Sequence, residues 1–296
     1  MVLYDGSSVN RKMPSHNLAQ VRLCELDILG YSVGGEETVV AVPQLDVCFD
    51  IGKAPDQVIP INFVLLTHGH IDHAAGFAYY LSHRQFNGQP PGTIVAPKVL
   101  LGPIRQILEA WGALDGNRIP GNLIGVGPGD EVQIKPNLIA RAFPTDHCRG
   151  SVGYCILERR RKLRPEYAGL SGPQIVELKR RGVTIDYPLE LPIISYLGDT
   201  RYIDYSSLAY VVNSRILIVE CTFFEKDHAD RADAGRHIHV QDLARLLAPL
   251  HNEHVVLIHI TQRTALAEAK RLLKEALPED LAEKVVILMD HRHRRQ

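Results

Sequence analysis

The stretch Thr67-His68-Gly69-His70-Ile71-Asp72-His73 places three imidazoles and a carboxylate in one short segment. It follows the apolar run Phe63-Val64-Leu65-Leu66, which predicts a buried strand. Imidazole and carboxylate groups are ligands for zinc and similar divalent ions, and a catalytic site leaves one coordination position to water. Ligands crowded into a tight loop after a strand would point into one pocket. The cluster therefore predicts a metal hydrolase, and the alternative is a histidine-rich surface turn.

The composition is that of an ordinary globular protein, with 45% hydrophobic and 23% charged residues. A chain of 296 residues can bury a full core, and because no linker divides it, we expect one domain over residues 1–296. No apolar run is long enough for a membrane span, so a membrane protein is not expected. The five cysteines form no CxxC pair and the N-terminal segment lacks a signal-peptide pattern, which favours the reducing cytoplasm. The net charge of −1 leaves nucleic-acid binding to local basic patches.

Strand-like and helix-like segments alternate in the C-terminal half of the chain, which predicts an α/β architecture with helices covering sheets. Periodicity does not give the strand order. Helical spacing is expected from about Ala75 to Arg84, from Val240 to Leu250 and from Ala265 to Ala276. The expected strands are Val39–Pro43, Val47–Gly52, Phe63–Thr67, Leu138–Phe143, Gly153–Leu157, Ile193–Leu197, Ile216–Val219, Val255–Ile258 and Val285–Leu288.

Further possible metal ligands follow other predicted strands. His147 comes after the strand that ends at Phe143, Asp199 follows Tyr196-Leu197-Gly198, and His259 ends the apolar run Val255–Ile258. Strand ends are where α/β folds place their sites. Taken singly, Asp199 could belong to a Gly-Asp-Thr turn and His259 could be a core histidine bonded to the backbone. Together with the histidine cluster, these residues indicate a site for two metal ions.

In their order along nearly the whole chain, Asp50, the cluster, His147, Asp199 and His259 resemble the motifs of the metallo-β-lactamase superfamily. The resemblance implies a four-layer αβ/βα sandwich and two zinc ions. The first ion would be held by His68, His70 and His147, the second by Asp72, His73 and His259, and Asp199 would bridge them. Water between two such ions loses its proton near neutral pH and becomes the nucleophile. The ligand types also suit manganese and iron, so the metal itself stays open.

Several segments resemble the ribonuclease Z family, in particular its short, plant-type form. Ser32–Thr38, Phe49–Gly52 and Ser151–Tyr154 are similar to segments of that family. The departures from its pattern are Arg236 in place of glycine, Asp146 before His147, and the absence of a tyrosine after Arg263. None of them removes a metal ligand.

The segment Val219-Glu220-Cys221-Thr222-Phe223, together with the later Arg236-His237-Ile238-His239, resembles two further motifs of that family. This implies that Glu220 orients His237, and that His237 protonates the leaving 3′ oxygen or stabilises the scissile phosphate. His239 is the alternative to His237. Asp72 could also accept the proton of the attacking water.

Residues 158–190 change in character to a strongly charged segment with a short predicted helix from Gln174 to Arg181. The part from Arg161 to Pro173 resembles the substrate arm of ribonuclease Z enzymes, which contacts the body of the tRNA. A basic arm could bind several phosphates, whereas the alternative is a solvated face whose charges are balanced by Glu158, Glu166 and Glu177. The substrate-binding candidates are Arg159, Arg160, Arg161, Lys162, Arg164, Gly172, Pro173, Lys179, Arg180 and Arg181.

The resemblance therefore implies a cytoplasmic, homodimeric, zinc-dependent endoribonuclease that removes the 3′ trailer of precursor tRNA. It would leave a 3′ hydroxyl on the tRNA and a 5′ phosphate on the trailer. The alternative is a hydrolase of the same fold that acts on a small phosphodiester, thioester or lactone, because a two-metal site does not separate these substrates. A metal-bound RNA-binding scaffold without turnover is a third possibility.

Overall fold

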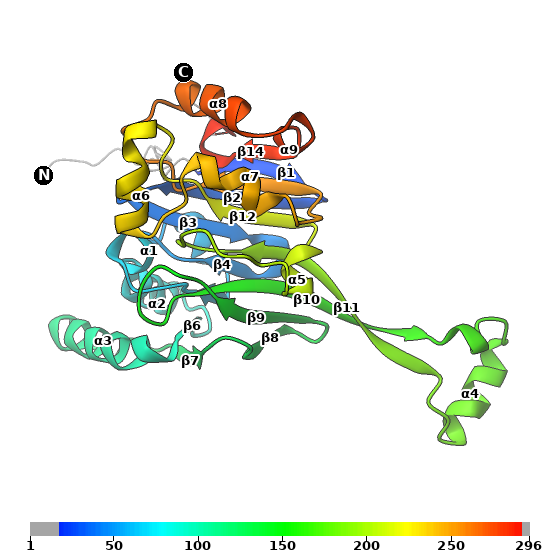
Figure 1. The fold of residues 1–296 in the computed structure, drawn as a ribbon. Helices are drawn as coiled ribbons and strands as arrows, with labels where there is room; N and C mark the ends of the chain where they lie inside the picture. Colours follow the sequence, from blue (N-terminus) through cyan, green and yellow to red (C-terminus); the bar gives the residue numbers. More distant parts are fainter. Residues whose placement is uncertain (1–17, 292–296) are drawn as a thin grey trace, which may run out of the picture.

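Two seven-stranded sheets form the centre of the molecule in the computed structural model, which describes residues 18–291 (Figure 1). The first sheet pairs its strands in sequence order, antiparallel from β1 to β4 and parallel from β4 to β7. Its strands are β1 (Ala19–Leu23), β2 (Leu26–Val33), β3 (Glu37–Val42), β4 (Val47–Phe49), β5 (Phe63–Leu65), β6 (Thr93–Pro97) and β7 (Asn122–Val126).

The second sheet repeats this plan. It is antiparallel from β8 to β11 and parallel from β11 to β14. Its strands are β8 (Glu131–Lys135), β9 (Leu138–Pro144), β10 (Val152–Leu163), β11 (Asp186–Tyr196), β12 (Ile216–Glu220), β13 (His254–Ile258) and β14 (Val285–Ile287).

Three apolar cores hold four layers together. The inner faces of the two sheets meet in the central core, where Phe49 of the first sheet stacks on Tyr196 of the second with ring centroids 4.7 Å apart. Helices α1 (Ile71–Ala74), α2 (Phe77–Phe86) and α3 (Leu101–Asp115) cover the outer face of the first sheet. The outer face of the second sheet is covered by α5 (Ala209–Val212), α7 (Val240–Leu247), α8 (Leu266–Ala276) and α9 (Glu279–Ala282), with α6 (Ala229–Gly235) nearby. The predicted four-layer sandwich is confirmed.

The longest of the described helices, α3, was not expected from the sequence, and neither were the short helices α1, α5, α6 and α9. Helix α3 contains Gly102, Pro103 and Gly112, and the prediction treated this region as turns. Pro103 lies in the first turn, where a missing backbone N–H costs no intrahelical hydrogen bond. Packing of Ile104 against the first sheet then outweighs the low helix propensity of the glycines.

None of the described helices combines the length and apolar character needed to cross a membrane.

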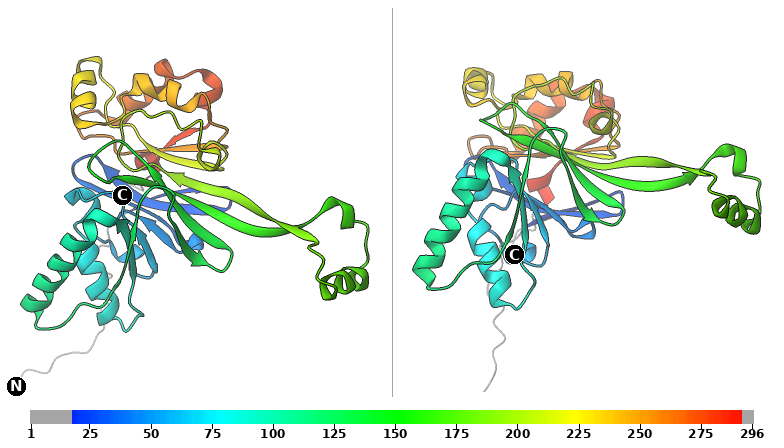
Figure 2. Two further views of the ribbon diagram at one scale, coloured as in Figure 1. Left: turned by 60° about the horizontal axis from the view of Figure 1, so that its bottom comes forward. Right: turned by 90° about the horizontal axis from the view of Figure 1, so that it is seen from below.

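The segment 158–190 leaves the body of the molecule as a long ribbon (Figure 2). Strands β10 and β11 continue far beyond the sheet, with Glu158 opposite Leu191 and Leu163 opposite Asp186. The tip carries α4 (Gly172–Arg180), whose bounds are close to those of the predicted helix. Ser171 caps its N-terminus, and the Ser171 N–H donates to Gln174 Oε1 at 2.8 Å. The prediction placed an arm here, and the structure adds that paired strands build its shaft.

Candidate metal centre

The carboxylate of Asp199 lies at the centre of the predicted ligands. Asp199 follows β11, and its side chain is buried with 2% exposure. Its Oδ2 atom lies 3.2–3.8 Å from a ring nitrogen of each of four histidines, namely His68, His73, His147 and His259. These residues come from loops of both sheets, because the ligand-bearing ends of β5, β9, β11 and β13 meet at one edge of the sandwich.

The predicted ligands fall into two groups around Asp199. His68, His70 and His147 lie together with Asp199, and the ring nitrogens His147 Nε2 and His70 Nδ1 are 3.0 Å apart. Asp72, His73 and His259 form the other group, where Asp72 Oδ2 is 3.6 Å from His259 Nε2. The structure thus brings all seven residues predicted as ligands close together.

Four of the histidines are held by a hydrogen bond on the ring nitrogen that faces away from the centre. His68 Nδ1 is 2.9 Å from Thr67 Oγ1, His73 Nδ1 is 2.8 Å from Asp50 Oδ2, and His259 Nδ1 is 3.0 Å from Thr222 Oγ1. His147 Nδ1 faces the carbonyl of Arg236 at 3.2 Å. Such partners fix the ring orientation and the tautomer, so that the other nitrogen is free to bind a metal.

Asp50 lies behind the candidate ligands and forms hydrogen bonds with several of the residues around them. It is fully buried, adopts a left-handed backbone conformation (φ 52°) and accepts hydrogen bonds from the Thr67 N–H and the Tyr196 hydroxyl, both at 2.8 Å. Sequence reasoning identified Asp50 as part of the motif. It missed Thr67, Thr222 and the Arg236 carbonyl, because a threonine or a backbone carbonyl carries no metal-site pattern of its own.

The predicted pair of Glu220 and His237 is formed next to the metal ligands. Glu220 is buried at the end of β12, and its Oε1 atom lies 2.8 Å from His237 Nδ1. Burial lowers the pKa of His237, but the Glu220 carboxylate outweighs this effect and raises it to about 9. The His237 ring stacks on that of His259 at 5.3 Å. His239, the alternative, instead accepts from the Gln241 N–H and caps α7, so the geometry favours His237.

Comparisons with known proteins identify the family of the chain. Residues 41–260 match the Beta-lactamase superfamily domain. The tRNase Z TRZ1 of Arabidopsis thaliana is 31% identical over 264 residues, which is 88% of this chain and 94% of that protein. The chain belongs to the tRNase Z family. A second Arabidopsis relative, tRNase Z TRZ2, chloroplastic, is 30% identical over 96% of this chain and 79% of its own length.

Solved structures support the fold of this tRNase Z-family chain. The metallo-β-lactamase fold protein YhfI from Bacillus subtilis aligns with a TM-score of 0.61 at 14% identity, over 91% of this chain and 94% of that one. The short form of human tRNase Z aligns with a TM-score of 0.54 at 15% identity, over 92% and 93%. At such low identity these likenesses show the fold alone.

The arm of this tRNase Z-family chain carries two kinds of basic residue. Along the paired strands of the arm, Arg159 pairs with Glu131 and Glu190, Arg160 with Glu158, and Arg161 with Asp186. Arg164 lies 3.9 Å from Glu166. At or near the tip, no ion pair within the described residues involves Lys162, Lys179, Arg180 or Arg181. Gly172 and Pro173 are the first residues of α4. The positive charge left for a partner is therefore concentrated toward α4.

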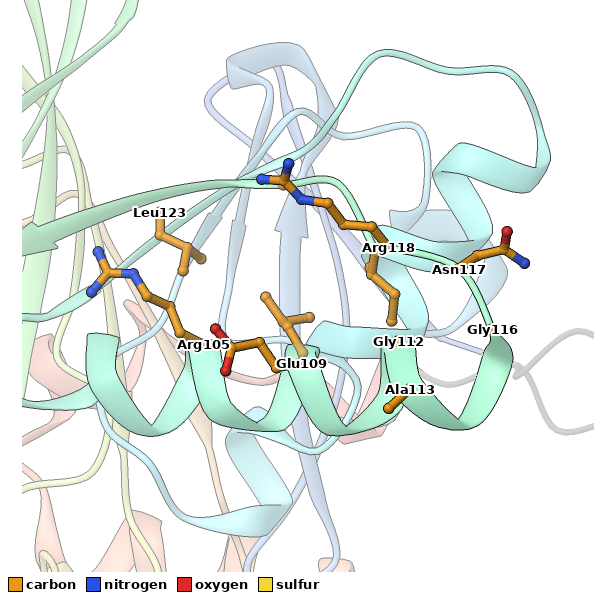
Figure 3. A pocket seen from close by; sticks show the side chains of 11 residues that line it. Arg105, Glu109, Gly112, Ala113, Gly116, Asn117, Arg118 and Leu123 are labelled. Atoms are coloured by element: carbon orange, nitrogen blue, oxygen red, sulfur yellow. The ribbon is translucent and has the colours of Figure 1, made fainter.

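A separate groove of about 670 Å³ runs along α3 (Figure 3). Arg105 and Arg118 line it, and neither forms an ion pair with another residue of the part that the structure describes. Glu109 and apolar side chains such as Leu123 complete the lining. None of the residues predicted from the sequence belongs to this groove, because its two arginines come from different segments and match no motif.

Proposed function

We propose that this chain is a zinc-dependent endoribonuclease that removes the 3′ trailer of precursor tRNA. Its relatives are named tRNase Z, and their similarity extends over almost the whole chain. The observation that carries the proposal is the convergence of four histidine nitrogens on Asp199 Oδ2 beside the Glu220–His237 pair. A site of this kind suits hydrolysis of a phosphodiester, in which water adds to phosphorus and the bond to the 3′ oxygen breaks.

The residues around Asp199 fit two divalent ions. His68 Nε2 and Asp199 Oδ1 are buried atoms without a hydrogen-bond partner, although buried polar atoms are normally paired. A cation would satisfy both. We assign His68, His70 and His147 to one ion, Asp72, His73 and His259 to the other, and Asp199 to both. Nitrogen and oxygen ligands in these numbers favour zinc, and manganese or iron would fit the same atoms.

Two bound ions would polarise the phosphodiester and activate the attacking water. The side chains around them then have separate roles. Asp72, whose Oδ2 atom accepts from the Gly35 N–H at 3.0 Å, accepts the proton of that water. His237 donates a proton to the leaving 3′ oxygen of the tRNA, and Glu220 holds the imidazole in its protonated form and orientation. The products are a tRNA with a 3′ hydroxyl and a trailer with a 5′ phosphate.

We assign binding of the tRNA body to the arm. The cations without an ion pair toward the tip, Lys162, Lys179, Arg180 and Arg181, contact phosphates, while the paired arginines along the strands stiffen the ribbon. Phosphate contacts position an RNA without reading its sequence. The arm would therefore select substrates by shape, and the metal centre would determine which bond is cut.

We also propose that two copies of the chain associate through α2 and α3. Each helix carries exposed apolar side chains at helical spacing, namely Tyr79 and Phe86 on α2, with the His83 ring stacked between them, and Ile107, Trp111 and Leu114 on α3. Phe86 is 85% exposed and Leu114 78% exposed. Exposed apolar patches of this kind mark protein interfaces.

The proposed location is the cytoplasm, where the five free cysteines would stay reduced.

The test is cleavage of an end-labelled precursor tRNA by the purified protein, with and without a chelator and with zinc or manganese added back. One metal-dependent cut next to the discriminator base would support the proposal. If metal-loaded protein leaves the tRNA intact but hydrolyses a small phosphodiester, the substrate assignment is wrong and the chain is a small-molecule hydrolase. Absence of any metal-dependent hydrolysis would overturn the proposed chemistry altogether.

A further inference from the structure

Arg236 adopts a backbone conformation that usually belongs to glycine. It follows the last residue of α6 with φ 53° and ψ 53°, in the left-handed region that ends many helices. A side chain in this region is unfavourable, and glycine avoids the cost. Arg236 also lies directly before His237. An arginine in this conformation needs an interaction that offsets the cost of the left-handed backbone.

That interaction is an ion pair with Asp146. Arg236 Nη1 lies 3.2 Å from Asp146 Oδ1 and 3.5 Å from the carbonyl oxygen of His147. The other oxygen of the same carboxylate, Asp146 Oδ2, lies 2.5 Å from Arg201 Nε. One carboxylate therefore connects an arginine that precedes His237 with an arginine that follows Asp199.

The backbone around these side chains is joined at the same place. The Arg201 N–H donates to the Asp146 carbonyl at 3.0 Å, and the Asp146 N–H donates to Thr200 Oγ1 at 3.0 Å. The Arg236 carbonyl faces His147 Nδ1 at 3.2 Å. When His147 donates from Nδ1 to this carbonyl, its Nε2 atom keeps the lone pair that faces the ligand group.

We propose that Asp146, Arg201 and Arg236 form a clamp that positions His147 for metal binding, with Arg236 acting through its carbonyl and Asp146 through Arg236. Asp146 and Arg236 directly precede His147 and His237 in the sequence, and the structure pairs them with each other. The clamp rests on the proposed metal site. It adds three positioning residues, none of which touches the substrate or the reacting atoms.

The variants Asp146→Asn and Arg236→Gly separate this role from a simple effect of charge. Loss of a negative charge near the cations weakens zinc binding, whereas loss of a positive charge strengthens it, so charge alone predicts opposite effects. If the clamp positions His147, both variants weaken zinc binding. Loss of a residue that orients a ligand typically lowers metal affinity by roughly 10- to 100-fold. Glycine tolerates the left-handed conformation, so Arg236→Gly is not expected to unfold the protein.

The measurement is zinc affinity by competition with a chromophoric chelator, with the thermal midpoint of each variant taken as a folding check. We expect at least about 10-fold weaker zinc binding in each single variant, and little further loss when both are combined, because they break one unit. Glu275→Gln is the matched control, since it removes an exposed carboxylate that pairs with Arg271 near the C-terminal end of α8. It should bind zinc as the unchanged chain does.

Unchanged or tighter zinc binding in a folded Arg236→Gly variant would overturn the clamp and leave the proposed function intact. Equal weakening by Glu275→Gln would also overturn it, because the effect would then be general. If the unchanged chain itself binds no zinc, the proposed metal site fails and the clamp fails with it.

Discussion

The Oδ2 atom of Asp199 lies 3.2 Å from Nε2 of His73, so a carboxylate from one sheet meets an imidazole from the other. This contact joins the halves of the sandwich at the place where the metal ligands gather. Burial raises the pKa of the Asp199 carboxyl, but the neighbouring His259 and His73 rings outweigh this effect and keep that pKa well below the usual range. The group is therefore an anion ready to bind cations.

Replacement of Asp199 by alanine should remove both metals or reduce their content to a small fraction, and hydrolysis should be abolished. The physical reason is that each proposed ion loses the same shared ligand. Metal content by elemental analysis and cleavage of precursor tRNA check this. Asp204→Ala, an exposed change later in the same loop, should keep metal and activity. Full activity of Asp199→Ala with one metal or none would contradict the two-metal assignment.

Glu220→Gln and His237→Ala should each lower kcat by roughly 100- to 10,000-fold, the range typical of lost general acid catalysis. Metal content should stay close to that of the unchanged chain, because neither residue is assigned as a ligand. The matched control is His239→Ala, which removes the cap of α7 and should cost about 0.5–2 kcal/mol of stability with a much smaller change in kcat. A larger loss of kcat in His239→Ala than in His237→Ala would reverse the assignment.

Neutralising Lys179, Arg180 and Arg181 together should raise KM for precursor tRNA and make binding less sensitive to salt. The log–log salt slope should fall by about one unit for each phosphate that the arm no longer neutralises. Turnover of a small aryl phosphodiester should be unaffected, because the tip projects far from the two-sheet body that carries the candidate ligands (Figure 2). Arg159→Ala, at the base, should change the salt slope less, because this arginine is already paired with Glu131 and Glu190. Equal losses on both substrates would exclude a binding role for the tip.

Trp111→Asp on α3 should shift the protein from dimer to monomer in analytical ultracentrifugation. A charge placed in an apolar interface must be desolvated without a partner, which opposes association. The comparison variant is Val176→Asp, since Val176 is also exposed but lies on α4 at the tip of the arm. If the unchanged chain sediments as a monomer, or Val176→Asp alone dissociates a dimer, the α2–α3 surface is not the interface.

Local sequence patterns were sufficient to predict the convergence of the candidate ligands, but not the pairing of the charges on the arm. His68, His147, Asp199 and His259 each follow a strand-like run, and strand ends meet at one edge of a sheet, so their convergence could be predicted. The partners of Arg159 are Glu131 and Glu190, which lie on different strands. Such pairing depends on which strands are neighbours, and periodicity does not give strand order. The same limit hid the contact between Asp146 and Arg236.

The arm is a continuation of β10 and β11, which are neighbours in the body of the sheet. A hairpin that grows out of two adjacent antiparallel strands can change its length without altering the order of any other strand. Because side chains alternate between the two faces of a strand, removal of two residues from each strand keeps every side chain on its face, whereas removal of one from each turns the tip over. Substrate choice in this architecture can therefore diverge through small paired deletions, while the residues that cut the phosphodiester are inherited unchanged.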